Sequence, residues 1–217
     1  MKCFDHFQPK YTSFALPYLL TRPDDSTPDE KLPLIVFLHG AGERGNDEEL
    51  LRVHGIAKYF GNDENHMGVR AITLSPQCPE GEIWSNFPSV IMELILHIAE
   101  KEGADIDRIS ITGISMGGFG TWSMLARYPQ FFSAGAPICG GGVNWYIGTK
   151  TPIRAFHGDA DSVVPLAYSQ IMVDAVNARG GNASLTIYHG CDHGSWVPAY
   201  EQTDLIPWLV ASVRPKD

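Results

Sequence analysis

The stretch RISITGISMGG, residues 108–118, holds the pattern that decides the fold. Residues 108–112 are typical of a buried strand, and a helix is predicted from about 117 to 128. Between them lies Ser115, with one glycine two residues before it and another two residues after it. This pattern predicts a turn that is too sharp for side chains on either flank and that holds Ser115 at its tip. The N–H groups and dipole of the following helix favour developing negative charge there.

Short apolar runs alternate with helical periodicities through the rest of the chain. The run 34–38 is continuously apolar, as expected of a strand buried on both faces, and an edge-strand pattern lies before it at 14–20. The order of elements predicts an α/β fold with a mainly parallel sheet and helices on both faces. Ligands on such a sheet bind beyond the carboxyl ends of the strands. Further strands are expected at 71–75, 134–138, 153–157 and 184–188, and helices at 89–101, 166–179 and 200–213.

The length and composition are ordinary for one globular enzyme domain. The 217 residues fit a single domain over 1–217, and the segment 22–33 is a turn between strands rather than a linker. A net charge of −9 argues against a nucleic-acid partner, which needs clustered Lys and Arg. The chain shows no secretory signal and no run of about 18 apolar residues, so we expect a cytoplasmic protein with no membrane partner. Assembly into a homo-oligomer stays open.

Four cysteines, Cys3, Cys78, Cys139 and Cys191, are spread along the chain. None forms a CxxC pair, which argues against a structural zinc site. Without a secretory signal we expect reduced thiols. No other cluster of residues has metal-ligand spacing, so neither a metal nor another cofactor is expected.

The segment His39-Gly40-Ala41-Gly42 directly follows the apolar strand 34–38. A loop at this position supplies an oxyanion-stabilising N–H in hydrolases that use a nucleophile elbow. Its small residues let the backbone approach a substrate carbonyl closely. We expect Ala41 N–H to be the donor from this loop, with Gly42 as the alternative, and Met116 N–H to be the second donor. His39 is expected to orient the loop through a backbone hydrogen bond rather than to act as a base.

Glu43 and Arg44 continue the same loop. Adjacent opposite charges can pair with each other or contact a substrate. We expect a solvated or loop-bracing pair.

A carboxylate and an imidazole follow the last two predicted strands. Asp161 precedes a Val-Val-Pro turn and is favoured over Asp159 as the acid, with Asp159 expected to brace its turn through backbone amides. His193 lies in a glycine-flanked loop and is the expected base, whereas His189 lies closer to the strand and is expected to be structural. The chain order Ser, Asp, His is typical of hydrolases with a nucleophile elbow.

Several strings resemble the esterase and phospholipase–carboxylesterase branch of the α/β-hydrolase superfamily, including dienelactone-hydrolase-like, feruloyl- and acetyl-esterase-like proteins and "predicted peptidases". The resemblance covers roughly residues 10 to 212 and implies the α/β-hydrolase fold and a Ser-Asp-His triad. The chain differs from these relatives at two places near the expected pocket. They often carry Asp where this chain has residues 143–145, and Asp or Asn where it has Gly194, so the substrate of a relative is not carried over to this chain. The strings are FLHGAGERGND, SPQCPEGEIW, DIDRISITGISMGGFGTW, YPQFFSAGAPICGGG, FHGDADSVVP and DHGSWVPAY.

The substrate pocket is expected to be open. Only 14 residues, 139–152, separate two predicted strands at the usual insertion point, which leaves no room for a cap domain beyond the crossover itself. Trp84, Trp145 and Trp196 are expected in loops at the active-site face, where they could form an aromatic wall. Trp122, on the helix after the turn, is expected in the core.

These features predict a serine hydrolase that cleaves carboxylic esters through an acyl-enzyme. Short acyl or aromatic acyl esters, free or glycan-linked, suit an open site. A thioesterase or an amidase or peptidase would use the same triad and is the alternative. A non-catalytic binding protein is disfavoured, because all three triad positions are retained.

Overall fold

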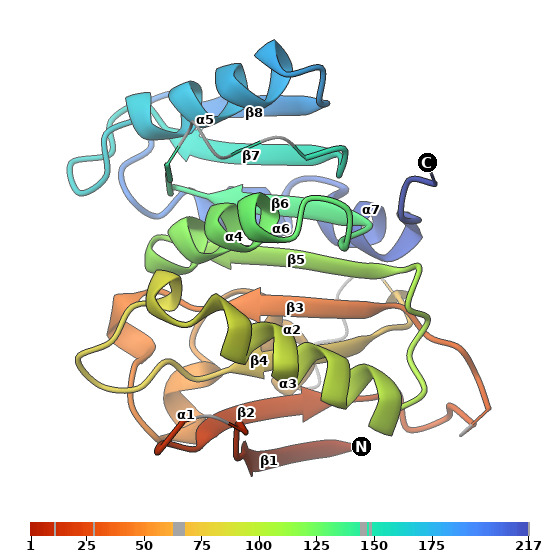
Figure 1. Cartoon of the computed structure of the whole chain (residues 1–217). Helices are drawn as coiled ribbons and strands as arrows, with labels where there is room; N and C mark the ends of the chain where they lie inside the picture. The colour runs from red at the N-terminus through yellow and green to blue at the C-terminus, as the bar shows by residue number, and fades with distance from the viewer. Residues whose placement is uncertain (11, 28, 63–67, 144–146, 148, 217) are drawn as a thin grey trace.

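The computed structural model describes residues 1–10, 12–27, 29–62, 68–143, 147 and 149–216. Over these ranges an eight-stranded sheet has the strand order β1-β2-β4-β3-β5-β6-β7-β8 (Figure 1). The six strands from β4 to β8 in this order are parallel, and β2 is antiparallel to both of its neighbours, β1 and β4. The strands are β1 Lys2–Phe7, β2 Leu16–Thr21, β3 Leu34–Leu38, β4 Ile72–Pro76, β5 Ile109–Ile114, β6 Ala134–Ile138, β7 Ile153–Gly158 and β8 Ala183–Tyr188.

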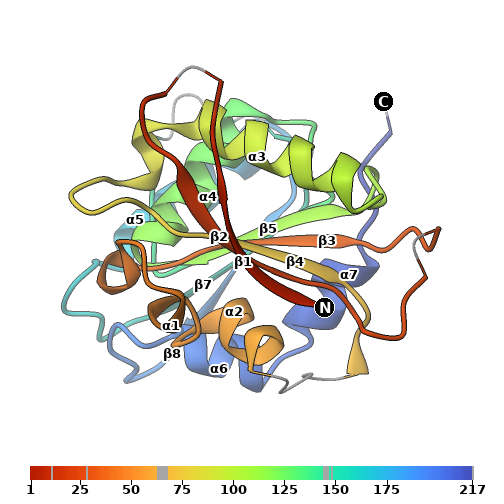
Figure 2. The same cartoon turned by 90° about the horizontal axis from the view of Figure 1, so that it is seen from below.

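Helices cover both faces of the sheet, which confirms the predicted fold class (Figure 2). One face carries α3 Pro88–Lys101, α4 Met116–Arg127 and α5 Ala167–Ala178. The other carries α1 Glu48–Leu51, α2 Gly55–Gly61, α6 Trp196–Glu201 and α7 Leu205–Ala211. Each face therefore has its own apolar core. None of the helices in the described ranges has the length and apolar character needed to cross a bilayer.

The prediction of an edge strand around Tyr18 was wrong. β2 pairs with β1 on one side and β4 on the other, and all six of its residues are buried. The apparent alternation misled because the intervening Leu19 is also covered, by α2 on the second face. β1 occupies the edge, and its mixed polar sequence gave no strand signal.

The predicted helix 200–213 is divided into α6 and α7. Thr203 lies between them, and its hydroxyl donates to the Ala199 carbonyl (2.7 Å) and accepts from Leu205 N–H (3.1 Å). Its hydroxyl thus links the last turn of α6 to the first residue of α7. The short α1 and α2 and two 3₁₀ turns, η1 Ala41–Glu43 and η3 Trp84–Asn86, were not predicted, because segments this short carry no clear helical period.

The turn between β5 and α4 has the sharp geometry that its glycines predicted. Ser115 has φ 53° and ψ −117°, a conformation that L-residues rarely adopt. A Cβ on Gly117 would stand 1.8 Å from the Leu38 carbonyl oxygen, and one on Gly113 would stand 2.4 Å from the Gly117 carbonyl oxygen. Only glycine permits β3, β5 and α4 to approach this closely.

No cap domain interrupts the sheet at the usual insertion point. Fourteen residues, 139–152, connect β6 to β7, and those that the structure describes form neither helix nor strand. The carboxyl end of the sheet is therefore not covered by an inserted domain there.

Replacing Gly117 with alanine should prevent this turn from forming. The added Cβ would meet backbone atoms of β3, which cannot move without separating β3 from α4. We expect the free energy of unfolding to fall by about 3 kcal/mol or more, measured by urea denaturation. Gly42→Ala is the control, because nothing lies within 4 Å of its Cβ position. Equal stability of the two variants would contradict this account.

Candidate active site

Ser115, His193 and Asp161 form a continuous line of hydrogen bonds at the carboxyl end of the sheet. His193 Nε2 lies 2.8 Å from Ser115 Oγ, and His193 Nδ1 lies 2.8 Å from Asp161 Oδ2. The three side chains come from the turn after β5 and from the loops after β7 and β8. Parallel strands place these loops at one edge of the sheet. The structure thus brings the predicted nucleophile, base and acid together.

The carboxylate of Asp161 has no exposed side-chain surface but is surrounded by donors. Its Oδ1 accepts from the N–H groups of Val163 (2.9 Å) and Val164 (2.8 Å). Burial raises the pKa of Asp161, but the bonds from His193 and these two N–H groups outweigh it and hold the pKa below its usual range. An ionised Asp161 makes His193 Nδ1 the donor, which leaves Nε2 to accept from the Ser115 hydroxyl.

His157 is a buried neighbour of Asp161 that the sequence did not single out. Its Nε2 lies 2.9 Å from the Val164 carbonyl oxygen and 3.2 Å from Asp161 Oδ2, and its Nδ1 lies 2.7 Å from Ser169 Oγ. The ring therefore ties the Asp161 loop to α5. A histidine at the carboxyl end of a predicted strand, directly before the acidic loop, was the signal that could have indicated it.

Asp159, the competing aspartate, makes a separate cluster. It accepts from Gly190 N–H (2.7 Å), and its other oxygen lies 2.7 Å from His189 Nδ1. The side chain of His189 is 88% exposed. Asp159 therefore braces the β7 loop against the β8 loop, rather than only its own turn, and the structure brings Asp161 to His193 instead.

The loop after β3 is held by His39, which is buried and makes only backbone hydrogen bonds. Its Nδ1 lies 2.6 Å from the Gly40 carbonyl oxygen and its Nε2 accepts from Cys78 N–H (2.9 Å). Burial lowers the pKa of His39 to about 4, so the ring is neutral at pH 7. With both nitrogens engaged, His39 orients the loop, as predicted.

Trp84 does not form part of an aromatic wall, which corrects the prediction. Its side chain is 1% exposed, and its Nε1–H donates to the His39 carbonyl oxygen (2.9 Å). The indole needs a partner for this polar group when it is buried, and it finds one in the loop after β3. Trp84 therefore supports the loop from beneath. Trp122 is buried in the core, as expected.

The other predicted substrate contacts are Trp196, Gly42 and Trp145. Trp196 is partly exposed, and its ring meets that of His193 edge to face at 5.5 Å. A side chain at Gly42 would point into open space. Trp145 lies outside the described residues. The roles of Trp196 and Gly42 toward a substrate stay predictions.

The two predicted oxyanion donors stand at the starts of helical turns. Ala41 begins η1 and is exposed, and Met116 begins α4. Within the described ranges neither N–H donates to another residue. Gly40, in the loop after β3, lies next to the nucleophile, because a Cβ there would stand 3.7 Å from Ser115 Cβ. The arrangement leaves both N–H groups available to a ligand.

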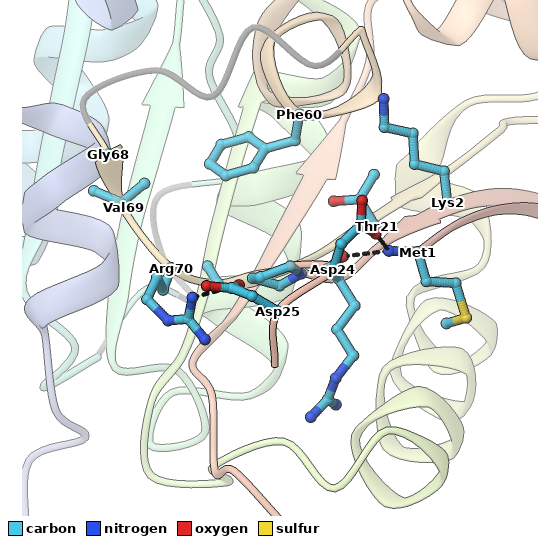
Figure 3. A pocket seen from close by; sticks show the side chains of 12 residues that line it. Met1, Lys2, Thr21, Asp24, Asp25, Phe60, Gly68, Val69 and Arg70 are labelled. Carbon is cyan, nitrogen blue, oxygen red and sulfur yellow. Dashed lines mark hydrogen bonds and ion pairs between the residues drawn. The ribbon is translucent and has the colours of Figure 1, made fainter. Parts of the chain in front are cut away.

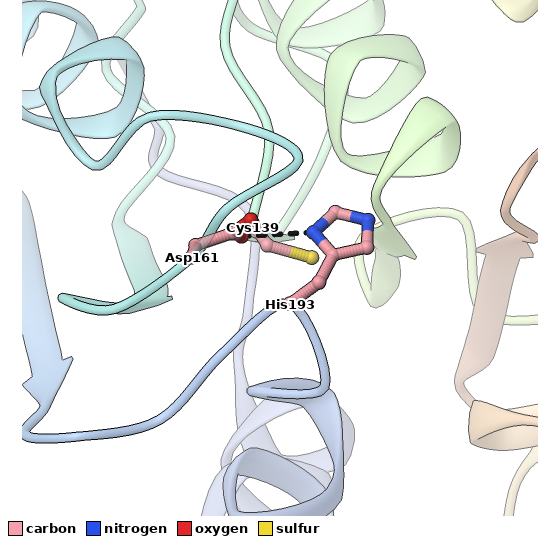
Figure 4. Close-up of side chains that lie close together, drawn as sticks. All are labelled: Cys139, Asp161 and His193. Carbon is pink, nitrogen blue, oxygen red and sulfur yellow. Dashed lines mark hydrogen bonds and ion pairs between the residues drawn. The ribbon is translucent and has the colours of Figure 1, made fainter.

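Cys139 lies beside this line of residues, as Figure 4 shows. Its sulfur and one donor atom each of Asp161 and His193 lie within 4.8 Å of one another. Burial raises the pKa of the Cys139 thiol to about 12, whereas a metal-bound cysteine is a thiolate. Asp161 and His193 are also paired with each other. Cys139 is therefore better described as a buried side chain that packs against Asp161 and His193 than as a metal ligand. All four cysteines are free thiols, as predicted.

A hollow of about 440 Å³ lies elsewhere, at the amino-terminal end of β4. Figure 3 shows it between ion pairs that join Met1 to Asp24 and Arg70 to Asp25. β3 pairs in parallel with both β4 and β5, so this hollow and Ser115 lie at opposite ends of the sheet. It does not belong to the candidate site.

Comparisons with known proteins point to one group of hydrolases. A model described as the dienelactone hydrolase family matches residues 80–204. The chain is 26% identical over 116 residues to a protein of Yersinia pestis described as a carboxymethylenebutenolidase, covering 45% of this chain and 40% of that protein. It is 26% identical over 110 residues to poly(3-hydroxyalkanoate) depolymerase C of Paucimonas lemoignei, covering 50% and 26%. The chain thus matches less than half the length of either relative.

Solved structures extend the comparison to nearly the whole chain. A thermostable esterase superimposes with a TM-score of 0.85 at 35% identity, covering 98% of this chain and 63% of that one. Native esterase 2 of Thermogutta terrifontis superimposes with a TM-score of 0.72 at 16% identity, covering 99% and 94%, and so shows a shared fold alone.

The buried His39 should make stability depend on pH. Its native pKa of about 4 lies below the value of about 6.5 in an unfolded chain. Between these values the unfolded chain binds a proton that the native ring does not, so this contribution is complete above pH 6.5 and is lost towards pH 4. We expect His39 to contribute about 3 kcal/mol to the free energy of unfolding over this pH range. The measurement compares how the free energy of unfolding changes with pH in the wild type and in His39→Gln. Identical slopes would contradict the assignment.

Proposed function

Because this chain belongs to the dienelactone hydrolase family and has the α/β-hydrolase fold of esterases, we propose that it hydrolyses carboxylic esters through an acyl-enzyme on Ser115. The observation that carries the proposal is the Ser115–His193–Asp161 line, with both hydrogen bonds at 2.8 Å. The family match spans all three residues. The proposal therefore rests on geometry as well as on similarity.

In the first half-reaction His193 Nε2 takes the hydroxyl proton as Ser115 Oγ attacks the ester carbonyl carbon. The carbonyl oxygen becomes an oxyanion, which the N–H groups of Ala41 and Met116 stabilise. The carbon–oxygen bond to the alcohol then breaks, and His193 gives its proton to the leaving oxygen. Ser115 is left as an acyl ester.

In the second half-reaction a water molecule takes the place of the alcohol. His193 accepts a proton from the water, whose oxygen attacks the acyl carbon. The bond from that carbon to Ser115 Oγ then breaks as His193 returns the proton to Oγ, which releases the carboxylic acid and restores the Ser115 hydroxyl. Asp161 keeps His193 in the tautomer with hydrogen on Nδ1 and stabilises the imidazolium in both steps. Its full burial strengthens this interaction, and its ordered donors keep it ionised.

The proposed substrates are esters of short or aromatic acyl groups, because no inserted cap covers the carboxyl end of the sheet in the described residues. Such a site also admits an ester at the end of a larger molecule. Thioesters and amides use the same chemistry, so matched oxygen-ester, thioester and amide substrates should be compared. We expect the oxygen ester to be cleaved with the highest kcat/KM.

Ser115→Ala should abolish turnover while leaving the fold intact, because the two side chains differ by one oxygen atom. Loss of a single member of such a triad lowers kcat by about 10⁴ to 10⁶. The rate on a 4-nitrophenyl ester and the melting temperature measure the two effects. A fluorophosphonate should label Ser115 in the wild type. Labelling at another serine, or a variant with more than a few per cent of the wild-type rate, would show that Ser115 is not the nucleophile.

Asparagine substitutions should separate the two aspartates. Asp161→Asn offers the wrong partner to His193 Nδ1, so we expect kcat to fall by about 10⁴. Asp159→Asn is the matched control, because Asp159 contacts His189 and Gly190 instead, and a loss of about tenfold or less is expected. Steady-state kinetics of both variants give the answer. A collapse in Asp159→Asn alone would overturn the assignment of the acid.

A further inference from the structure

Glu43 is a buried carboxylate that the proposed mechanism does not use. The residue is 8% exposed, and within the described ranges its Oε2 is buried without a hydrogen-bond partner. The expected pairing with Arg44 was wrong, because the Arg44 guanidinium donates to the carbonyl oxygens of Ala41 and Glu82. His39 Nδ1 lies 3.8 Å from Oε2 and is already bonded to Gly40. An unpaired buried acceptor is costly for folding and calls for an explanation.

Glu43 and the nucleophile lie on the same side of Gly40. A Cβ on Gly40 would stand 3.1 Å from Glu43 Oε2 and 3.7 Å from Ser115 Cβ. Because residue 40 has no side chain, the space between the carboxylate and the nucleophile is not filled from this loop. The Glu43 carboxyl group and Ser115 therefore lie close to each other, with no side chain of this loop between them.

Contacts between neighbouring side chains also connect Glu43 to His193. Glu43 Oε1 lies 4.0 Å from His54 Nε2, the His54 ring lies 5.3 Å from that of Trp196, and the Trp196 ring lies 5.5 Å from that of His193. Gly55, with φ +59°, packs against the Phe37 ring and so fixes the start of α2, where His54 stands. These side chains therefore form a continuous row of contacts from Glu43 to His193, whose Nε2 lies 2.8 Å from Ser115 Oγ.

We propose that this region, bordered by Glu43, His54 and Trp196, is a subsite for the alcohol part of the ester, and that Glu43 accepts a hydrogen bond from a hydroxyl group on that alcohol. The subsite rests on the proposed ester hydrolysis at Ser115. Its preferred substrates are monoesters of polyols, such as glycol, glycerol or sugar esters, in which a free hydroxyl lies near the ester oxygen.

The chemistry of the reaction places the alcohol on this side. His193 must protonate the leaving oxygen, so the alcohol has to lie against His193, and Trp196 is the ring in contact with it. A hydroxyl suits Glu43 better than an ammonium group does. Burial raises the pKa of Glu43 more than the nearby His54 and the backbone N–H groups of Gly40 and Glu43 lower it, and a hydroxyl can bond either form of the carboxyl group. An ammonium would lose its hydration with one partner to replace it.

The test compares two acetates that differ in one group, 2-hydroxyethyl acetate and propyl acetate. The wild type should have a kcat/KM about tenfold or more higher on the hydroxyl-bearing ester, as one hydrogen bond to a charged group provides. In Glu43→Met this ratio should fall to about one, mainly by loss of rate on 2-hydroxyethyl acetate. Glu43→Gln, which keeps the shape but loses the charge, should lower the ratio by several-fold.

Glu80→Met is the matched control, because Glu80 is an exposed carboxylate on the loop after β4 and should leave the ratio unchanged. Glu43→Met should melt no lower than the wild type, since it removes an unpaired buried carboxylate. Equal kcat/KM on both acetates in the wild type, or an equal loss on both in Glu43→Met and Glu43→Gln, would overturn the subsite alone. A wild type that cleaves no ester and is not labelled at Ser115 would overturn the proposed function itself.

Discussion

The contact between Gly117 and the carbonyl oxygen of Leu38 is the constraint on which the rest of this site depends. Because residue 117 has no Cβ, α4 begins directly against the end of β3. The chain can make this turn only with Ser115 at positive φ, which costs about 1 to 3 kcal/mol of backbone strain. The same turn sets Ser115 beside Gly40, so one close contact positions the nucleophile and the loop that faces it.

Two buried carboxylates near Ser115 differ in how they are satisfied, and this difference separates their roles. Asp161 receives bonds from His193 and from two backbone N–H groups, which hold its pKa low and its position fixed. Glu43 has a raised pKa and an oxygen without a partner in the described residues. A carboxylate whose oxygens all have hydrogen-bond partners orients a neighbour, whereas one with an oxygen that lacks a partner retains the capacity to bind a further group.

The support around these residues comes from buried side chains that do not touch the nucleophile. Trp84 and His39 hold the loop after β3 through backbone hydrogen bonds, and His157 holds the Asp161 loop against α5. The ring nitrogens of all three form hydrogen bonds, to backbone groups in the case of Trp84 and His39 and to the Val164 carbonyl and Ser169 Oγ in the case of His157. Such support is what keeps hydrogen bonds of a reacting group at short distances.

The sequence by itself determined the order of β2 to β8 and of the longer helices, the turn at Ser115 and the parallel arrangement that gathers the loops, because these follow from local periodicity and glycine spacing. It also favoured Asp161 and His193, which lie 32 residues apart, and His193 meets Ser115 across a separation of 78 residues. Only the tertiary structure decided that β1 is the edge strand, that Trp84 is core, that His157 backs Asp161 and that Glu43 is buried unpaired. These depend on which side chains from distant segments cover one another, and a local pattern does not record such contacts.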